Sequence, residues 1–253
     1  MIIKTIFKKI KIHPFFYLIA ILAIITGLFK QFLILSTIII IHELGHILTA
    51  LYYKWQIDKI IILPFGGLTI FKEFINRPIN EELLITIMGP INQILFYFFY
   101  NFLFGQNILI TNYHYGILLF NLLPIYPLDG IKIINLLLSK WISFKMSHLV
   151  TIFISIIMII IVLILSLIFK INMTFLLILI FLLVKIYSEL KNHHYLFNKF
   201  LFERYLYNFS FNKRKIIKGD KIKKMFRDYK HLFYIDEKYY LEREILKKKF
   251  DFK

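Results

Sequence analysis

The stretch HELGH at residues 42–46 lies inside the apolar run FLILSTIIIIHELGHILTALYY, residues 32–53. Two imidazoles and a carboxylate are costly inside a bilayer unless they have partners and a function. Positions i and i+4 of a helix share a face, so His42 and His46 can bind one metal ion together. In the H-E-x-x-H arrangement of zinc hydrolases, the histidines bind Zn²⁺ and the glutamate, here Glu43, takes the proton from the attacking water. The short pattern also occurs by chance in soluble helices, but its position in an apolar run favours a metal site.

The composition excludes an ordinary soluble domain. The chain has 253 residues, of which 59% are hydrophobic and 28 are Phe, whereas the apolar share of soluble domains is roughly 45–50%. We therefore expect a polytopic membrane protein. The absence of cysteine excludes disulfides and thiolate zinc ligands. The net charge of +17 comes from lysines that flank apolar runs and fill the C-terminal tail, as topology-setting charges do, and no nucleic-acid partner is expected.

Six apolar runs have roughly the length of a membrane span, about 20 residues at ~1.5 Å per residue. They are Phe15 to Phe29, Phe32 to Tyr53, Leu83 to Phe104, Gly116 to Leu138, Leu149 to Phe169 and Met173 to Leu190. The expected fold is an all-α polytopic membrane protein with six transmembrane helices, a short membrane-associated β-hairpin loop and a small cytoplasmic C-terminal appendage. The first two runs are joined through Lys30 and Gln31, which predicts a tight helical hairpin.

Basic residues alternate between the two sides of these runs. One side carries Lys4, Lys8, Lys9, Lys11, Lys54, Lys59, Lys72, Arg77, Lys140 and Lys145. The other side has only Lys30, Lys170 and an uncharged loop from Gly105 to Tyr115. The positive-inside rule therefore predicts that both termini are cytoplasmic.

Two shorter segments carry polar or helix-breaking residues. Ile60 to Phe71 is apolar but too short to span, and its β-branched stretches around Gly66 and Gly67 predict a hairpin or re-entrant loop. Its free strand edge could pair with an extended peptide, although a purely structural loop fits equally well. The third run opens with MGPINQ at residues 88–93, which predicts either support of the metal helix or simple close packing.

The fourth run contains NLLPIYPLDG at residues 121–130. Its two prolines predict a broken helix, which is tolerated at membrane depth only against protein or a wet cavity. Asp129 follows the break, and a carboxylate would complete a His₂-carboxylate zinc site with one position for water. The alternative role for Asp129 is a helix N-cap after Pro127. We favour the metal ligand, because two histidines already need a third.

The other histidines and the C-terminal tail are not expected to take part in catalysis. His148, His193 and His194 lie at the ends of expected spans, where surface or interfacial positions are favoured over metal binding. The expected domains are a six-span core, residues 1–190, and a basic cytoplasmic tail, residues 191–253. The charges and aromatics of the tail predict a small folded appendage attracted by anionic lipid, rather than a disordered tail.

Four motifs in order make the sequence resemble a known family. HELGH at 42–46, LPFGG at 63–67, MGPIN at 88–92 and NLLPIYPLDG at 121–130 are similar to the site-2 family of intramembrane metalloproteases, in the branch of the stage IV sporulation protease FB. The resemblance covers about residues 30 to 140. It implies one Zn²⁺ per chain held by His42, His46 and Asp129, with Glu43 as general base.

The resemblance also implies where substrate is held and what it is. Asn121 and Pro127 would lie beside the site that holds substrate, together with the Gly66-Gly67 hairpin. The implied substrate is a membrane-tethered precursor, in this branch that of a sporulation sigma factor, in the bacterial cell membrane or the membrane around the forespore. Other candidate partners are membrane-protein regulators, the lipid bilayer and a second copy of the chain in a homo-oligomer. The branch carries a nucleotide-binding CBS domain, and the shorter tail here resembles at most one degenerate half of it.

A different class of function uses the same residues. A metal or proton transporter could employ the buried His, Glu and Asp side chains as an ion path. The position of Glu43, directed at the water instead of acting as a further ligand, favours the protease.

Overall fold

In a computed structural model of the protein, residues 9–63, 66–169 and 173–251 are described. The chain divides into two compact units. The first unit consists of Met1–Glu73 and Leu84–Leu122, and the second of Phe74–Leu83 and Leu123–Lys253. Each unit is described by itself.

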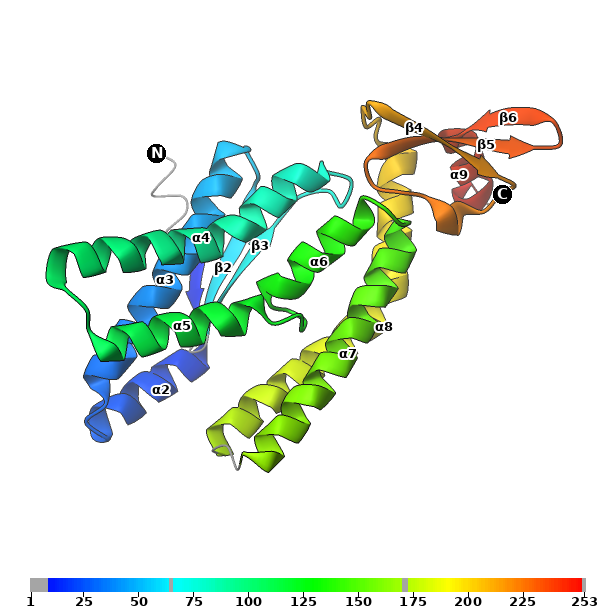
Figure 1. Cartoon of the computed structure of the whole chain (residues 1–253). Helices are drawn as coiled ribbons and strands as arrows, with labels where there is room; N and C mark the ends of the chain where they lie inside the picture. Colours follow the sequence, from blue (N-terminus) through cyan, green and yellow to red (C-terminus); the bar gives the residue numbers. More distant parts are fainter. Residues whose placement is uncertain (1–8, 64–65, 170–172, 252–253) are drawn as a thin grey trace. The chain divides into compact units, whose positions relative to one another are not determined.

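The helices of the first unit are α2 (Pro14–Ile25), α3 (Phe29–Tyr52), α5 (Ile108–Leu122) and most of α4 (Ile79–Phe104), whose first turn belongs to the second unit (Figure 1). The predicted hairpin of the first two helices is present, but its turn lies at Gly27 and not at Lys30 and Gln31. Gly27 has φ +72, a left-handed conformation that glycine adopts without steric cost. Lys30 and Gln31 therefore lie in the first turn of α3.

A three-stranded sheet completes the first unit. The strands β1 (Ile10–Ile12), β2 (Ile57–Leu63) and β3 (Gly66–Phe71) lie in the order β1-β2-β3, with β1 parallel and β3 antiparallel to β2. This confirms the predicted hairpin, although Pro64 and Phe65 at its turn lie outside the described residues. Within the described residues, the outer edge of β3 pairs with no strand. Ile47 of α3 packs against Ile57 and Ile60, so the sheet lies against the helix that carries the histidines.

The second unit contains α6 (Asp129–Ser139), α7 (Phe144–Ile168) and α8 (Met173–Leu206). The expected fourth span differs from the structure, because α5 already begins at Ile108, within the expected loop, and the chain leaves the helix between Leu122 and Asp129. The two prolines of that segment explain the break, since proline lacks the N–H that a helix needs. The peptide bond between Tyr126 and Pro127 is cis.

The tail folds into a C-terminal module, residues 213–250, as expected for a folded appendage. It comprises β4 (Lys213–Lys218), the 3₁₀ turn η1 (Ile222–Lys224), β5 (Tyr229–Ile235), β6 (Lys238–Leu241) and α9 (Glu242–Phe250). β4 is parallel and β6 antiparallel to β5. Asp236 and Glu237 join β5 to β6 with positive φ, as a tight two-residue hairpin requires.

The C-terminal module is joined to helix ends of the same unit. Its core residues Phe233 and Leu246 pack with Phe200 of α8. The carboxylate of Asp228 accepts a hydrogen bond from the backbone N–H of Ile79 at the start of α4, at 3.3 Å. Arg227 donates to Glu82 in the first turn of α4 at 2.7 Å. Helix α8 runs through the expected domain boundary at residue 190 without interruption.

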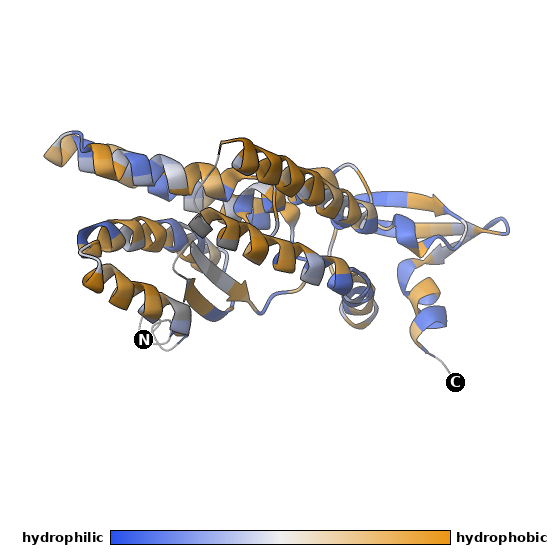
Figure 2. Ribbon diagram, turned by 90° about the horizontal axis from the view of Figure 1, so that it is seen from below, coloured by the Kyte–Doolittle hydropathy of each residue, from blue (hydrophilic) through white to orange (hydrophobic). Residues whose placement is uncertain are grey.

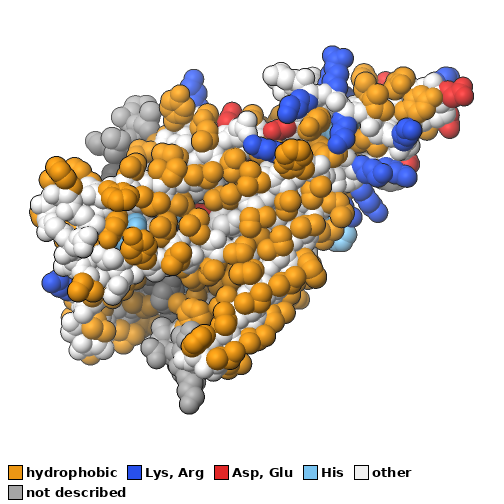
Figure 3. All heavy atoms as spheres, in the orientation of Figure 1, with side chains coloured by type: hydrophobic (Ala, Val, Ile, Leu, Met, Phe, Trp, Pro, Cys, Tyr) orange, Lys and Arg blue, Asp and Glu red, His pale blue; other side chains and the backbone are white. Residues whose placement is uncertain are grey.

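The helices and the C-terminal module differ in hydropathy and charge. Hydrophobic residues dominate the helices, whereas the segment that ends at the C-terminus alternates between hydrophilic and hydrophobic (Figure 2). Lysine and arginine gather over the C-terminal module on the face shown in Figure 3. Among the described residues, three helices are long and apolar enough to cross a membrane, namely α3, α4 and α7. The chain is therefore a membrane protein, and the finer expectation of six spans stays a prediction.

Candidate active site

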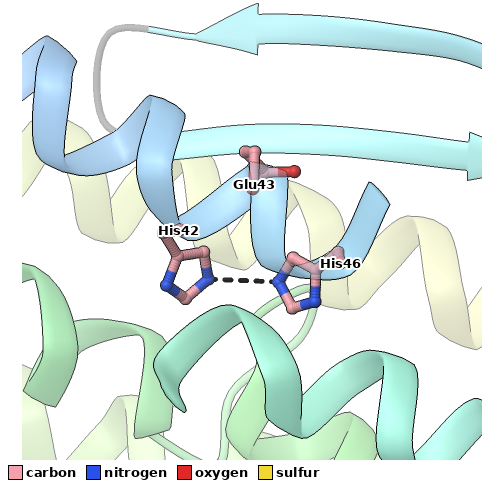
Figure 4. Close-up of side chains that lie close together, drawn as sticks. All are labelled: His42, Glu43 and His46. Atoms are coloured by element: carbon pink, nitrogen blue, oxygen red, sulfur yellow. Dashed lines mark hydrogen bonds between the residues drawn. The ribbon is translucent and has the colours of Figure 1, made fainter. Parts of the chain in front are cut away.

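The two histidines of the HELGH motif lie on one face of α3, as their spacing predicts. Both side chains are buried, and their Nε2 atoms are 3.1 Å apart (Figure 4). Together with a carboxylate oxygen of Glu43 they form a group whose ligand atoms all lie within 4.8 Å of one another.

The other nitrogen of each ring is held by α4. The Nδ1 atom of His42 lies 3.0 Å from the side-chain oxygen of Gln93, and the Nδ1 atom of His46 lies 2.8 Å from the backbone oxygen of Ile85. Both partners are acceptors, so both Nδ1 atoms carry the proton and the lone pairs lie on Nε2. Metal-binding histidines usually have one ring N–H fixed in this way. A hydrogen bond between the two Nε2 atoms would require one ring to be protonated, whereas a cation satisfies both.

The donor set fits zinc. In a tetrahedral site with ligand distances of about 2.0–2.1 Å, neighbouring ligand atoms lie about 3.3–3.4 Å apart, close to the observed 3.1 Å. Gly89 of α4 leaves the necessary space, because a Cβ atom there would lie 2.2 Å from Nε2 of His46. Imidazole nitrogen is also a ligand type that zinc commonly takes.

Glu43 is held from the other side, by strand β3. The hydroxyl of Thr69 donates to the Glu43 carboxylate at 3.0 Å. A Cβ atom at Gly67 would lie 2.2 Å from Cγ of Glu43, so only glycine allows the strand to approach this closely. The carboxylate is therefore fixed close to the two histidine rings.

Helices α3 and α4 approach closely at the site. A Cβ atom at Gly45 would lie 2.2 Å from the backbone oxygen of Met88. The side chain of Asn92 donates to the backbone oxygen of Ile41 at 2.6 Å. The polar contact expected from MGPINQ is thus confirmed, and Gln93 provides the support of a histidine that was one of its two alternatives.

The structure also places the residues of the Pro-broken segment. The side chain of Asn121, near the end of α5, donates to the backbone oxygen of Ile117 at 3.1 Å. Asp129 is buried in the second unit and lies 3.2 Å from the ammonium group of Lys132. It is not the N-cap of α6: the N-cap is Leu128, and Asp129 stands in the first turn.

The sequence analysis did not predict several of the contacts that hold the side chains of the HELGH motif. Thr69 and the backbone of Ile85 hold the side chains of Glu43 and His46, but nothing in their local sequence connects them to residues 42–46. The amide of Gln93 also donates to the backbone oxygen of His114 at 2.9 Å, and the His114 ring stacks on Tyr97 at 4.1 Å. An amide inside an apolar run was the one signal that pointed to Gln93.

Comparison with known proteins agrees with this geometry. Residues 30–116 match peptidase family M50. Stage IV sporulation protein FB of Bacillus subtilis is 36% identical over 205 residues, which cover 78% of this chain and 71% of that protein. The chain belongs to peptidase family M50.

Further matches of this M50 peptidase, to a curated sequence and to a solved structure, come from Methanocaldococcus jannaschii. Zinc metalloprotease MJ0392 is 34% identical over 119 residues, which cover 43% of this chain and 34% of that protein. The solved structure of the site-2 protease from the same organism superimposes with a TM-score of 0.56 at 26% identity, covering 71% of this chain and 89% of that chain. The protein is thus an intramembrane zinc metalloendopeptidase of the site-2 protease family, as the sequence resemblance implied.

Proposed function

We propose that this M50 peptidase cleaves membrane-tethered precursor proteins in or next to their membrane segment, and that a sporulation sigma-factor precursor is its substrate. The observation that carries the reaction type is the group of His42, His46 and Glu43 on one turn of a buried helix, with both Nδ1 atoms already engaged. The identity with Stage IV sporulation protein FB supports the substrate class.

In this proposal His42, His46 and Asp129 hold one zinc ion. The side chain of Asp129 is a buried carboxylate. Together with the two imidazoles it would give the His₂-carboxylate ligand set that is found in catalytic zinc sites. Zinc, when bound, polarises the scissile carbonyl and acidifies the attacking water. Glu43 accepts the proton of that water on its carboxylate and passes it to the leaving amine. Thr69 fixes the carboxylate during both transfers.

Substrate must be extended before it can be cut. A peptide in a membrane is helical with its carbonyls internally bonded, so the scissile bond has to be unwound first. The outer edge of β3 offers backbone groups to such a strand, and β3 also carries the contacts to Glu43. We assign Gly66, Gly67, Asn121 and Pro127 to holding the unwound strand.

The proposed orientation of the enzyme rests on the charge pattern, and its proposed membrane rests on the similarity to Stage IV sporulation protein FB. We place both termini in the cytoplasm and the enzyme in the bacterial cell membrane, including the membrane around the forespore. Membrane-protein regulators and a homo-oligomer are further proposed partners. Reporter fusions at residue 110 and at the C-terminus test the topology. A cytoplasmic signal at residue 110, or an external one at the C-terminus, would contradict it.

The decisive experiment is co-expression with membrane-tethered precursors, scored by a shortened product. Glu43→Gln preserves size and hydrogen bonding but removes the base, so we expect it to retain zinc and lose cleavage. His46→Ala and Asp129→Ala should lose zinc, measured by metal analysis of the purified protein. Near wild-type cleavage by Glu43→Gln would exclude the mechanism. A metal or proton transporter is the alternative that family membership disfavours, and it would move ions without shortening any precursor.

A further inference from the structure

A second group of possible metal ligands lies in the second unit, away from the HELGH motif in sequence. It contains His148 in the second turn of α7, and Glu189 and His193 of α8. Helices α7 and α8 pack side by side (Figure 1). Glu189 and His193 are separated by four residues, so they share one face of α8.

The two histidines of this group are buried where surface positions were expected, and the Glu189 side chain is 29% exposed. His148 is 4% and His193 5% exposed, whereas the neighbouring His194 is exposed. The expectation of surface or interfacial histidines is therefore wrong for two of the three. The reason is that α8 continues to Leu206 as one helix, and the face that carries His193 packs towards α7.

One pair of this group, His148 and Glu189, already has the spacing of metal ligands. The Nε2 atom of His148 lies 3.6 Å from a carboxylate oxygen of Glu189, and neighbouring ligands of a tetrahedral zinc ion lie about 3.3–3.4 Å apart. The Nδ1 atom of His148 lies 3.5 Å from the hydroxyl of Tyr126, which fixes the ring from behind. This division of the two nitrogens resembles that of His42, with one nitrogen held and the other directed at a neighbouring ligand.

His193 supplies the observation that an ordinary ion pair does not explain. Its ring stacks on that of His148 with centroids 5.2 Å apart and 7° between the planes. Within the described residues, neither of its ring nitrogens has a hydrogen-bond partner. Buried polar groups nearly always have a partner, so this ring needs one. Binding of an ion shared with His148 would require the His193 ring to rotate about its soft Cβ–Cγ bond.

Two lysines of the same unit interact electrostatically with this group and also have other contacts. Lys132 interacts with Glu189, and Lys145 interacts with His193. The ammonium group of Lys132 lies 3.2 Å from Asp129, and that of Lys145 lies 5.5 Å from the ring centre of Phe197.

We propose that His148, Glu189 and His193 form a second metal site, which takes a divalent transition metal such as Zn²⁺. Two imidazoles and a carboxylate suit this class of ion and leave a position for water. The ion fixes α7 to α8 and, through the contact of His148 with Tyr126, stabilises the Pro-broken segment before Asp129. Its role is structural and separate from the proposed catalytic zinc.

Zinc stoichiometry of the purified full-length chain tests the proposal without an activity assay. The samples are dialysed against buffered free Zn²⁺, and the metal content is measured by mass spectrometry. We expect about two zinc ions in the wild type and about one in the double variant His42→Gln/His46→Gln. His193→Gln should also lose about one ion. The matched control is His194→Gln, a change of the exposed neighbouring histidine, which should lose none.

The outcomes separate the two sites. Retention of about one zinc by the folded double variant, and its loss on adding Glu189→Gln, support the second site whatever the fate of catalysis. A Co²⁺ titration of the double variant should give visible absorption that Glu189→Gln abolishes, which covers the case that His193→Gln does not fold. No metal in the folded double variant, or equal zinc in His193→Gln and His194→Gln, would overturn the proposal.

Discussion

Both compact units bury histidines, but His42 and His46 of the first unit use their ring nitrogens differently from His231 of the second. In the first unit, His42 and His46 each use Nδ1 for a hydrogen bond to α4 and direct Nε2 towards the other ring. In the second unit, His231 is completely buried but has contacts at both nitrogens. Its Nε2 accepts a hydrogen bond from the backbone N–H of Phe226 at 3.0 Å, and its Nδ1 lies 3.5 Å from Glu242.

Burial alone therefore does not distinguish a metal ligand from a structural histidine. A ligand needs a ring nitrogen that no protein group already engages and that can be directed at an ion. His231 has no such nitrogen, so it serves the fold of the C-terminal module. The next four changes test this difference, beginning with the largest expected effect.

Gly89→Ala fills the space at the metal side of His46. Because the new Cβ atom would lie 2.2 Å from Nε2, the ring or α4 must move, and overpacking of this kind costs about 1–3 kcal/mol. We expect zinc affinity to fall about 100-fold, measured by competition with a chelator. Gly116→Ala on α5 is the matched control, since nothing lies within 4 Å of a Cβ atom there. Equal affinities of the two variants would show that the space beside Nε2 is not needed.

Gln93→Leu removes the acceptor that fixes His42 and leaves Nε2 untouched. Loss of such an outer partner typically costs 10- to 100-fold in metal affinity, and we expect a loss of that size. Gln93→Glu keeps an acceptor for the Nδ1 proton of His42, so it should restore most of the affinity. If both variants bind zinc like the wild type, fixing Nδ1 does not contribute to metal binding.

Thr69→Val tests whether positioning of the general base Glu43 can be weakened without an effect on metal binding. The change keeps the shape of the side chain but removes the hydrogen bond to Glu43. We expect about a tenfold lower kcat, corresponding to about 1.4 kcal/mol, with unchanged zinc content. Cleavage rate and metal content of the same preparation are the two measurements. A parallel loss of zinc would mean that Thr69 supports the metal site as a whole.

The pH dependence of the C-terminal module tests the structural histidine. Burial lowers the pKa of His231 below its ordinary 6.5. Burial opposes ionisation of Glu242, but the hydrogen bond from His231 and the charge of Arg204 hold the pKa of Glu242 below its usual value. For both groups the unfolded chain binds protons more readily than the folded one, so acidification favours unfolding. The stabilisation is present above pH 6.5 and declines as the pH falls below it.

Hydrogen exchange of the β5 amides, corrected for the intrinsic rate, should therefore report weaker protection at about pH 5.5 than at pH 7.5. His231→Gln keeps an acceptor for the Phe226 N–H and does not titrate, so it should remove most of this difference. An unchanged pH dependence in His231→Gln would assign the effect to other groups.

The sequence predicted the chemistry better than the geometry that supports it. The spacing of His42 and His46 fixes their common helical face, and the glycines and β-branched residues of Ile60 to Phe71 define a hairpin, because both features depend on local backbone preferences. The contacts of Gln93, Ile85 and Thr69 depend on which helices and strands pack together, and a local pattern contains no such information. The same limit applies to His193, whose burial follows from a helix that continues past the end of its apolar run.

The cap that Asp228 provides for α4 has a consequence for how the protein can be shortened. The backbone N–H groups at the start of a helix have no partner within it, and here one of them is supplied from a residue 149 positions later in the chain. Helix α4 is also the element that holds both histidines through Ile85 and Gln93. A truncated enzyme that ends after α8 would therefore lose the C-terminal module and also the carboxylate that accepts the hydrogen bond from the first turn of α4. The helix that supports the metal-binding histidines would then begin without this cap.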